Sequence, residues 1–231
     1  KNIMNFILFD NEKWQTLLPL TFTRPISEIR IGIMTISEKW RFVQPGDYSF
    51  FTQPYLQEKF KLHVENDNIL INASILPNSD LIASIGSLKP GQKLVSSAEI
   101  IAARVTRSQV EQGLESLLNM ETVECIHNYV SISLPWDIFT YNEIALKYDF
   151  DLITKGRTSQ KIDKSNRVLG EENIFIEEGA KVFCSILNAT TGPIYVGKDA
   201  EIMEGSIVRG ALAMCDHSAL KLGAKIYGAT T

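Results

Sequence analysis

An apolar residue recurs at every sixth position towards the end of this chain. The series is unbroken and consists of Val196, Ile202, Val208, Met214, Leu220 and Ile226. A second series follows four residues later, and five of its six members are small: Ala200, Ser206, Leu212, Ser218, Ala224 and Thr230. Helices repeat every 3.6 residues and ordinary strands every two, so a strict step of six indicates a triangular parallel β-coil with three six-residue faces per turn. We expect the first series to point into a narrow prism and the second to lie near its corners.

Residues suited to sharp bends occupy positions between the two series. They are glycines or short polar residues, namely Gly197, Asp199, Gly205, Gly210, Asp216 and Gly223. An earlier stretch shares the register, with Ile176 followed by Ala180 and Val182 followed by Ile186. Val196 comes fourteen residues after Val182, two more than two hexads. We therefore expect a small loop to bulge near residues 188–193.

This pattern resembles the hexapeptide-repeat family, whose fold is a left-handed parallel β-helix. The resemblance implies an acyltransferase that acts on sugars, amino acids or coenzyme A thioesters, and it implies a homotrimer. Such a coil can also be a trimerisation stalk and nothing more. Residue 231 falls on a hexad boundary, without the atypical unit that closes a solenoid. We therefore expect a longer protein, in which any acyl-transfer site lies beyond this residue.

Composition narrows the function classes. Of the 231 residues, 45% are hydrophobic, which suffices for a sizeable core, and the repeat divides the chain into two domains, residues 1–155 and 156–231. A net charge of −4 offers no basic surface to nucleic acid or to an anionic membrane. The apolar segment Phe6–Phe9 is too short for a membrane span or a signal core. The spacing of Cys125, Cys184 and Cys215 is not that of a metal or redox site. We therefore expect these cysteines to be small apolar core residues, and we expect a cytoplasmic protein.

Strands alternate with helices in the first 150 residues, which indicates an open α/β sheet. The expected strands are residues 5–10, 48–52, 68–75 and 94–105. One expected helix runs to about Arg41 and has an apolar face of Ile29, Ile33, Ile36 and Trp40. Two more are expected at residues 108–120, with Ser108 as N-cap, and at residues 137–148. The polar residues 155–167 then form a linker to the coil.

Three segments of this first part resemble the sugar-1-phosphate nucleotidylyltransferases. The segment Leu18–Pro25, Leu-Pro-Leu-Thr-Phe-Thr-Arg-Pro, is similar to the Pro-Leu-Thr…Arg-Pro tail of that family's nucleotide loop. Asn68–Ser74 resembles the hydrophobic strand that ends in Gly-Asp in the family, and Pro135–Asn142 resembles the Pro-Trp-Asp segment that closes the catalytic domain. Together with the coil, they resemble the bifunctional uridylyltransferase/acetyltransferases that make activated N-acetylglucosamine, and also the glucose-1-phosphate thymidylyltransferases. The resemblance implies a Rossmann-like nucleotidylyltransferase domain that precedes the β-helix.

This chain departs from the family in the segments that bind the phosphates and the metal ion. Nucleotidyl transfer uses a glycine-rich turn whose amide groups approach the phosphates, whereas this chain has Phe9–Trp14, Phe-Asp-Asn-Glu-Lys-Trp, and no glycine before Gly32. The family holds Mg²⁺ with carboxylates. The resemblance aligns one of them, the aspartate of the family's Gly-Asp, with Ser74 in the pair Ala73–Ser74, and it aligns the second with Ser131. A serine hydroxyl is neutral. Mg²⁺ is therefore a candidate cofactor whose expected carboxylates are missing.

Positive charge for a phosphate could come from Arg24 and Arg30, since the planar guanidinium group suits phosphate oxygens. Arg24 and Thr23 lie in the matched segment, and Arg30 lies where the expected helix begins, an end that favours anions. Both arginines can equally be ordinary surface residues. Lys39 is a weaker candidate because an exposed helical lysine is usually solvated.

Two carboxylates are candidates for catalysis, Asp10 after the first strand and Asp137 at the start of a helix. Asp137 can instead be an N-cap. Asn72 could hydrogen-bond a base or a sugar, or cap the end of its strand. His217 lies in a coil turn, where acyltransferases of the resembled class often place a base. His63 and His127 lack zinc spacing.

Two functions remain open from the sequence. In the first, the chain belongs to nucleotide-sugar biosynthesis and transfers a nucleotidyl group to a sugar 1-phosphate or acylates a sugar. In the second, the first domain has lost its metal site and holds a nucleotide sugar as a binding or regulatory module, while the coil trimerises. The missing glycines and carboxylates favour the second, and the retained arginine segment favours some ligand site.

Overall fold

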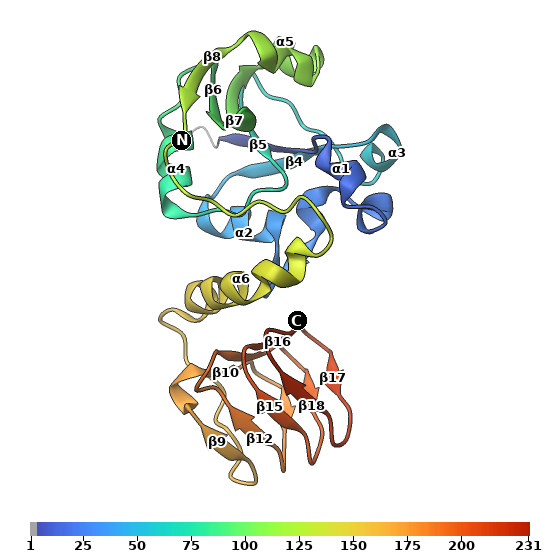
Figure 1. Ribbon diagram of the computed structural model, residues 1–231, viewed down its shortest axis with the longest axis vertical. Helices are drawn as coiled ribbons and strands as arrows, with labels where there is room; N and C mark the ends of the chain where they lie inside the picture. Colours follow the sequence, from blue (N-terminus) through green and yellow to red (C-terminus); the bar gives the residue numbers. More distant parts are fainter. Residues whose placement is uncertain (1–3) are drawn as a thin grey trace. The chain divides into compact units, whose positions relative to one another are not determined.

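The computed structural model describes residues 4–231, and these divide into two compact units. The first unit comprises residues up to Ile29 together with Thr35–Asp137. The second comprises Arg30–Met34 together with Ile138–Thr231. Figure 1 shows a sheet with helices in the first unit and a stack of short strands in the second.

A six-stranded sheet of order β4-β1-β5-β7-β6-β8 forms the centre of the first unit. Its strands are β1 (Asn5–Phe9), β4 (Asp47–Phe51), β5 (Asp67–Asn72), β6 (Gln92–Ser96), β7 (Glu99–Thr106) and β8 (Glu121–Glu124). β1 lies between β4 and β5 and is parallel to both, whereas β7 is antiparallel to β5 and to β6. All five residues of β1 are buried, as expected for a strand that is covered on both faces. The α/β prediction for this part is confirmed, with an antiparallel extension.

The helices of the first unit are short. They are α1 (Lys13–Thr16), η1 (Leu20–Thr23), η2 (Ile26–Glu28), α2 (Ile36–Val43), α3 (Pro54–Gln57), α4 (Ser79–Gly86), α5 (Arg107–Glu111) and η3 (Leu114–Asn119). A capping box starts α2, in which the Thr35 hydroxyl accepts from the Glu38 amide and the Glu38 carboxylate accepts from the Thr35 amide. The indole of Trp40 is buried and donates to the carbonyl of Ile75 at 2.9 Å. This bond ties α2 to the segment that follows β5.

The expected helix up to Arg41 is wrong in its first half. Residues 30–35 form a two-stranded ribbon instead, with β2 (Arg30–Ile31) and β3 (Met34–Thr35), and the helix begins only at Ile36. Gly32 turns the ribbon with φ of +73°, a conformation in which glycine is favoured. Arg30 is therefore on a strand, and it does not lie at the start of a helix.

Helix α6 (Asp137–Thr154) explains this ribbon. The Asn142 side chain accepts from the Gly32 amide at 2.7 Å, and one Asp149 oxygen accepts from the Ile33 and Met34 amides at 2.8 and 3.1 Å. These amides bond to side chains that come more than a hundred residues later, so they take no part in a helix. The apolar spacing of residues 29–36 arises from a buried ribbon.

The expected helix at residues 108–120 is also wrong as a single element. α5 ends at Glu111, Gly113 follows with φ of +85°, and the 3₁₀ helix η3 comes after it. The N-cap of α5 is Thr106, which forms a capping box with Gln109. This N-cap lies two residues before the expected N-cap, Ser108. Helix α4, capped by Asn78 through the Leu81 amide at 2.9 Å, was not expected.

The second unit contains three parallel sheets. Their strands are β9 (Arg167–Leu169), β10 (Ile174–Ile176), β11 (Lys181–Val182), β12 (Ile186–Asn188), β13 (Ile194–Val196), β14 (Glu201–Ile202), β15 (Ile207–Arg209), β16 (Leu212–Met214), β17 (Ala219–Leu220) and β18 (Lys225–Tyr227). In the later turns, strands pair with partners eighteen residues on, as Val196 does with Met214 and Val208 with Ile226. Val196, Ile202 and Val208 are at most 1% exposed. The predicted parallel strands and inward-facing series are confirmed.

The earlier turn of the coil departs from the step of six. Val182 pairs with Ile202, but the buried partner of Val208 is Leu187, while Ile186 is 37% exposed. The extra residues lie between β12 and β13, where the small loop was expected. Within this unit, Leu146 and Phe150 of helix α6 belong to one hydrophobic cluster with Phe175 of β10 and Tyr195 of β13.

Candidate functional site

The carboxyl ends of the parallel strands β1, β4 and β5 bring polar residues together. Asp10 follows β1, Thr52 follows β4, and Asn72 is the last residue of β5. A cleft of about 450 Å³ opens beside them. Its lining combines aromatic, amide and carboxylate side chains, among them Phe9, Asp10, Asn11, Trp14, Gln53 and Glu99.

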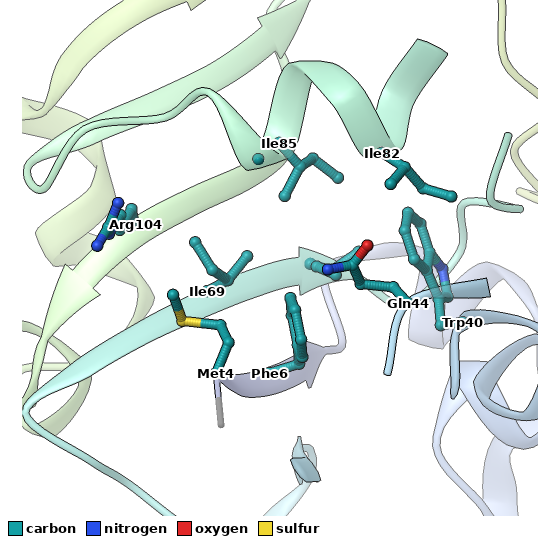
Figure 2. Close-up of a pocket in the computed structure, with 10 residues that line it drawn as sticks. Met4, Phe6, Trp40, Gln44, Ile69, Ile82, Ile85 and Arg104 are labelled. Atoms are coloured by element: carbon teal, nitrogen blue, oxygen red, sulfur yellow. The ribbon is translucent and has the colours of Figure 1, made fainter. Parts of the chain in front are cut away.

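Another pocket lies on the sheet beneath α2 and α4 and is mainly apolar (Figure 2). It measures about 220 Å³ and is lined by Phe6, Trp40, Ile69 and Ile85. Its charged group, Arg104, is engaged by both carboxylate oxygens of Asp67 at 2.6 and 2.9 Å. The cleft beside Asp10 offers the more varied polar chemistry and is therefore the candidate site.

Asp10 is a buried carboxylate that lines this cleft. Its Oδ1 accepts from the Ile26 amide at 2.9 Å and its Oδ2 accepts from the Thr52 hydroxyl at 2.5 Å. Burial is the dominant influence and raises the pKa of Asp10 to about 6, although both hydrogen bonds act in the opposite direction. Asp10 thus fastens the end of the Leu18–Pro25 segment to the sheet edge, and it titrates close to neutral pH.

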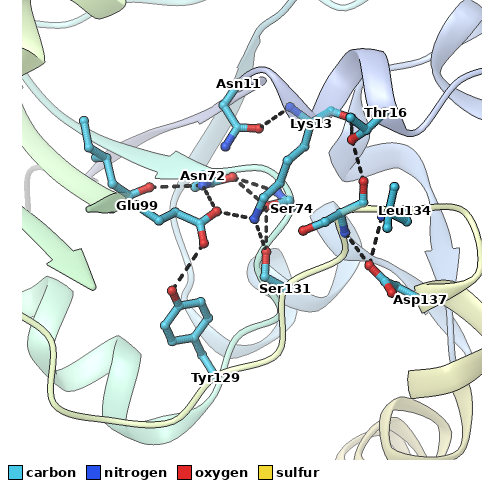
Figure 3. Close-up of polar contacts among 12 residues, drawn as sticks. Asn11, Lys13, Thr16, Asn72, Ser74, Glu99, Tyr129, Ser131, Leu134 and Asp137 are labelled. Carbon is cyan, nitrogen blue, oxygen red and sulfur yellow. Dashed lines mark hydrogen bonds and ion pairs between the residues drawn. The ribbon is translucent and has the colours of Figure 1, made fainter. Parts of the chain in front are cut away.

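Lys13 is the centre of a polar cluster beside Asp10 (Figure 3). Its ammonium group forms an ion pair with Glu99 and donates to the Ser131 hydroxyl at 2.8 Å. The Ser74 hydroxyl lies 3.5 Å from the same nitrogen. The side chains of Lys13 and Glu99 are 14% and 23% exposed. Sequence reasoning missed both residues, although Lys13 belongs to the segment that stands in place of the glycine-rich turn.

Asn72 organises the oxygen atoms around this lysine. Its Oδ1 accepts from the Ser74 amide at 3.1 Å and from the Ser74 hydroxyl at 2.9 Å. Its Nδ2 donates to Glu99 and to the Ile100 carbonyl, each at 3.0 Å. Asn72 is fully buried, so its amide group holds neighbouring side chains in place and is not presented to the cleft.

Mg²⁺ does not fit the positions that the family resemblance assigns to its ligands. Ser74 and Ser131 hydroxyls occupy them, and the Lys13 ammonium is bonded to this pair. A cation at that place repels a second cation, and the neutral hydroxyls compensate no charge. Across residues 4–231, no group of three or more His, Cys, Asp and Glu side chains could hold a metal ion.

Arg24 and Thr23 are exposed at the end of η1. Within the described part of the chain, the Arg24 side chain forms no hydrogen bond or ion pair, so its guanidinium group is available to a ligand. The Tyr55 hydroxyl donates to the carbonyl of the neighbouring Phe22 at 2.9 Å. This bond holds the loop that carries Arg24.

Arg30 and Asp137 have structural partners. The Arg30 guanidinium donates to the Ile33 carbonyl within the ribbon of the second unit. Asp137 Oδ2 accepts from the amides of Ser133 and Leu134 at 2.7 and 2.9 Å. These two residues precede α6, so the carboxylate closes the turn that leads into the helix.

The remaining predicted candidates lie elsewhere. Lys39 is 1% exposed, contrary to the expectation of an exposed lysine. His217 is exposed in a coil turn with φ of +59°, and its Nδ1 lies 3.9 Å from an Asp199 oxygen. Cys125, Cys184 and Cys215 are unpaired, and Cys184 is exposed, so it is not a buried filler. No helix within residues 4–231 has the length and apolar character needed to cross a membrane.

Comparison with protein-family models gives a match. A family model described as sugar nucleotidyl transferase matches residues 6–158. This range begins in β1, includes every residue named in the cleft and in the Lys13 cluster, and ends after α6. None of the curated proteins matches the chain.

Proposed function

Because this chain belongs to the sugar nucleotidyl transferase family, we propose that its first domain, about residues 1–155, binds a nucleotide sugar or a sugar phosphate in the cleft beside Asp10. The observation that carries the proposal is the position of this cleft. β1 is flanked by β4 on one side and β5 on the other, and the cleft lies beyond its carboxyl end. In open α/β sheets, ligands bind at such a reversal of strand order.

The side chains around the cleft suit the parts of such a ligand. Trp14 lines the cleft, and its buried indole nitrogen has no partner within the described residues. An aromatic ring with amides such as Asn11 and Gln53 suits a base or a sugar. Arg24, which follows η1 and is not among the residues that line the cleft, is proposed to contact a phosphate of the ligand through a charge-assisted bond. These features support binding of the intact ligand.

Binding of the ligand, and not rapid Mg²⁺-dependent turnover, is the function that we favour. A phosphoryl reaction relies on metal ions to neutralise charge in its transition state, and Mg²⁺ does not fit at Ser74 and Ser131. The alternative is a working nucleotidylyltransferase of nucleotide-sugar biosynthesis. The family match supports a nucleotidyltransferase function in general terms.

A ligand screen tests this proposal. Isothermal titration calorimetry with UDP-N-acetylglucosamine and dTDP-glucose, each with Mg²⁺ or with EDTA, should show saturable binding in both conditions. A pyrophosphate-release assay should run in parallel with uridine or thymidine triphosphate and glucose 1-phosphate or N-acetylglucosamine 1-phosphate. Brisk Mg²⁺-dependent turnover that is abolished by Asp10→Ala or Asp137→Ala would contradict the binding function and would show that the domain is a catalyst. The absence of binding to every probe would contradict the proposed site.

For the second unit we propose a left-handed β-helix of hexapeptide repeats that assembles as a homotrimer. The eighteen-residue pairing of its three parallel sheets supports the helix. On the sheet β9-β12-β15-β18, the exposed side chains Ile186 and Ile207 are register partners and form an apolar strip that a second copy would cover.

An acyltransferase role of this trimer belongs to the same proposal, and the release of thiol from acetyl coenzyme A in the presence of amino sugars tests it. A cytoplasmic location is likewise part of the proposal. The three unpaired cysteines are compatible with a reducing compartment.

A further inference from the structure

The Lys13 ammonium is a cation built into the sheet edge where the family resemblance expects a metal ion. It reaches from α1, directly after β1, to three residues that lie far away along the chain. Its ion pair joins it to Glu99 across 86 residues, and its bond to Ser131 spans 118 residues. Figure 3 shows the side chain pointing into the group formed by Asn72, Ser74, Glu99 and Ser131.

Every partner of this lysine is held by a further bond. The Ser74 and Ser131 hydroxyls lie 2.9 Å apart, and the Asn72 amide binds both Ser74 and Glu99. The Tyr129 hydroxyl donates to the other Glu99 oxygen at 3.3 Å. Because its acceptors are fixed in this way, the ammonium has a defined position before any ligand arrives, which lowers the cost of ordering on binding.

The charge of the cluster equals that of a metal site. A divalent ion held by two carboxylates is neutral as a whole, and so is Lys13 paired with Glu99. Replacing a divalent ion and its two carboxylates by this ion pair therefore keeps the charge balance at the sheet edge. An ammonium group still offers a localised positive charge and rotatable donors to a phosphate.

One donor of Lys13 is only weakly engaged. The ion pair with Glu99 and the 2.8 Å bond to Ser131 use two of the three N–H groups. The third faces the Ser74 hydroxyl at 3.5 Å, at the limit of a hydrogen bond. Ser74 itself is already bonded to Asn72. A phosphate oxygen can therefore replace Ser74 as the third acceptor without leaving a buried group unsatisfied.

We propose that Lys13 takes the place of the divalent metal and binds a phosphate oxygen of the ligand, so that binding is independent of divalent metal ions. This inference rests on the proposed function, since Glu99, the ion-pair partner of Lys13, lines the cleft of that function. It assigns the phosphate contact to the Lys13 cluster. Lys13 is a binding residue in this assignment, and Asn72 is a positioning residue that acts through Glu99 and Ser74.

Calorimetry with UDP-N-acetylglucosamine in EDTA tests the inference. Lys13→Met keeps the length of the side chain but removes its charge, and it should weaken binding by about 10- to 100-fold, the effect of losing one charged hydrogen bond. The double variant Lys13→Met/Glu99→Gln avoids an unpaired carboxylate and should fold with the same weak affinity. Lys147→Met removes an ammonium from an exposed ion pair with Glu143 and serves as the matched control, with unchanged affinity.

The outcomes separate the two proposals. If the unmodified protein binds the probe equally well in EDTA and in Mg²⁺ and the double variant binds weakly, the inference holds. If the double variant binds as tightly as the unmodified protein, or if the unmodified protein needs Mg²⁺, the role of Lys13 is refuted while the proposed binding function stands. If the unmodified protein binds none of the nucleotide sugars, both are refuted.

Discussion

The side-chain hydroxyls of Ser74 and Ser131 lie 2.9 Å apart, although 57 residues separate them along the chain. An antiparallel bridge between Ile75 and Ser131 produces this contact, with a bond from the Ile132 amide to the Ser74 carbonyl at 2.9 Å. The bridge carries Ser131 to the carboxyl end of β5. The two positions that the family resemblance assigned to metal carboxylates therefore do meet, but they meet as hydroxyls around Lys13.

A metal site should appear when the missing carboxylates are restored. The triple variant Lys13→Ala/Ser74→Asp/Ser131→Asp removes the cation and adds two acidic ligands beside Glu99, and carboxylate oxygens are the ligands that Mg²⁺ and Mn²⁺ prefer. We expect it to bind one Mn²⁺ by electron paramagnetic resonance. The unmodified protein should bind none at this site. Equal Mn²⁺ binding by both proteins would show that Lys13 does not exclude the metal.

Asp10 should make the stability of the protein depend on pH between about 4 and 6. Burial raises its pKa to about 6 in the folded state, above the ordinary value that it has in the unfolded chain. Below about pH 4 the carboxyl is protonated in both states, so its contribution to stability is fully present. That contribution is lost as the pH rises through the folded pKa. Above pH 6 the loss of stability amounts to about 3 kcal/mol.

Urea unfolding of the unmodified protein and of Asp10→Asn at pH 4.5 and pH 7.5 measures this effect. Asparagine carries no charge at either pH, so the variant should gain stability relative to the unmodified protein as the pH rises. The comparison cancels the titration of all other groups. A difference between the two proteins that is the same at both pH values would show that the folded-state pKa of Asp10 is not raised.

Asp137 should contribute to stability and not to catalysis. Asp137→Ala leaves the amides of Ser133 and Leu134 without their acceptor, which should lower the free energy of unfolding by about 1–3 kcal/mol. Asp137→Asn keeps one acceptor oxygen and should lose less. Affinity for UDP-N-acetylglucosamine, measured below the melting temperature of each variant, should be unchanged. A selective loss of affinity in a variant of normal stability would place Asp137 in the binding site.

Arg24 should affect ligand affinity without affecting stability. Its side chain is exposed and has no partner among residues 4–231, so Arg24→Ala should leave the melting temperature unchanged. Loss of its contact with a phosphate should weaken binding of UDP-N-acetylglucosamine by about tenfold. Arg209→Ala, which removes another exposed arginine on β15, is the control. Equal affinities of both variants and the unmodified protein would remove Arg24 from the site.

The apolar strip on the second unit should determine the oligomeric state. Light scattering after size exclusion should give three times the chain mass of 25.9 kDa. Ile186→Lys/Ile207→Lys places two charges on the strip and should yield a monomer, because a charge is costly to bury without a partner. Leu222→Lys alters an equally apolar but separate exposed position and should remain trimeric. A monomeric unmodified protein at high micromolar concentration would contradict the trimer.

The local sequence predicted those elements in which the spacing of the apolar residues matches their burial in the fold. The step of six from Val196 to Ile226 predicted the parallel strands because each side chain repeats the environment of the one a turn earlier. The apolar run at residues 6–9 predicted β1 for a similar reason, since a strand covered on both faces needs no alternation. In the earlier turn the buried residue Leu187 comes five residues after Val182, so the step of six is interrupted and the register could not be read.

Tertiary contacts decided the ribbon at residues 30–35 and the chemistry of the cleft. The spacing of Ile29, Ile33 and Ile36 is that of a helix, but Asn142 and Asp149 take the amides that such a helix would use. The family resemblance showed which carboxylates were absent at Ser74 and Ser131. It did not show that the Lys13 ammonium contacts both hydroxyls, because its ion pair with Glu99, 86 positions away, exists only once β1, β5 and β7 have paired.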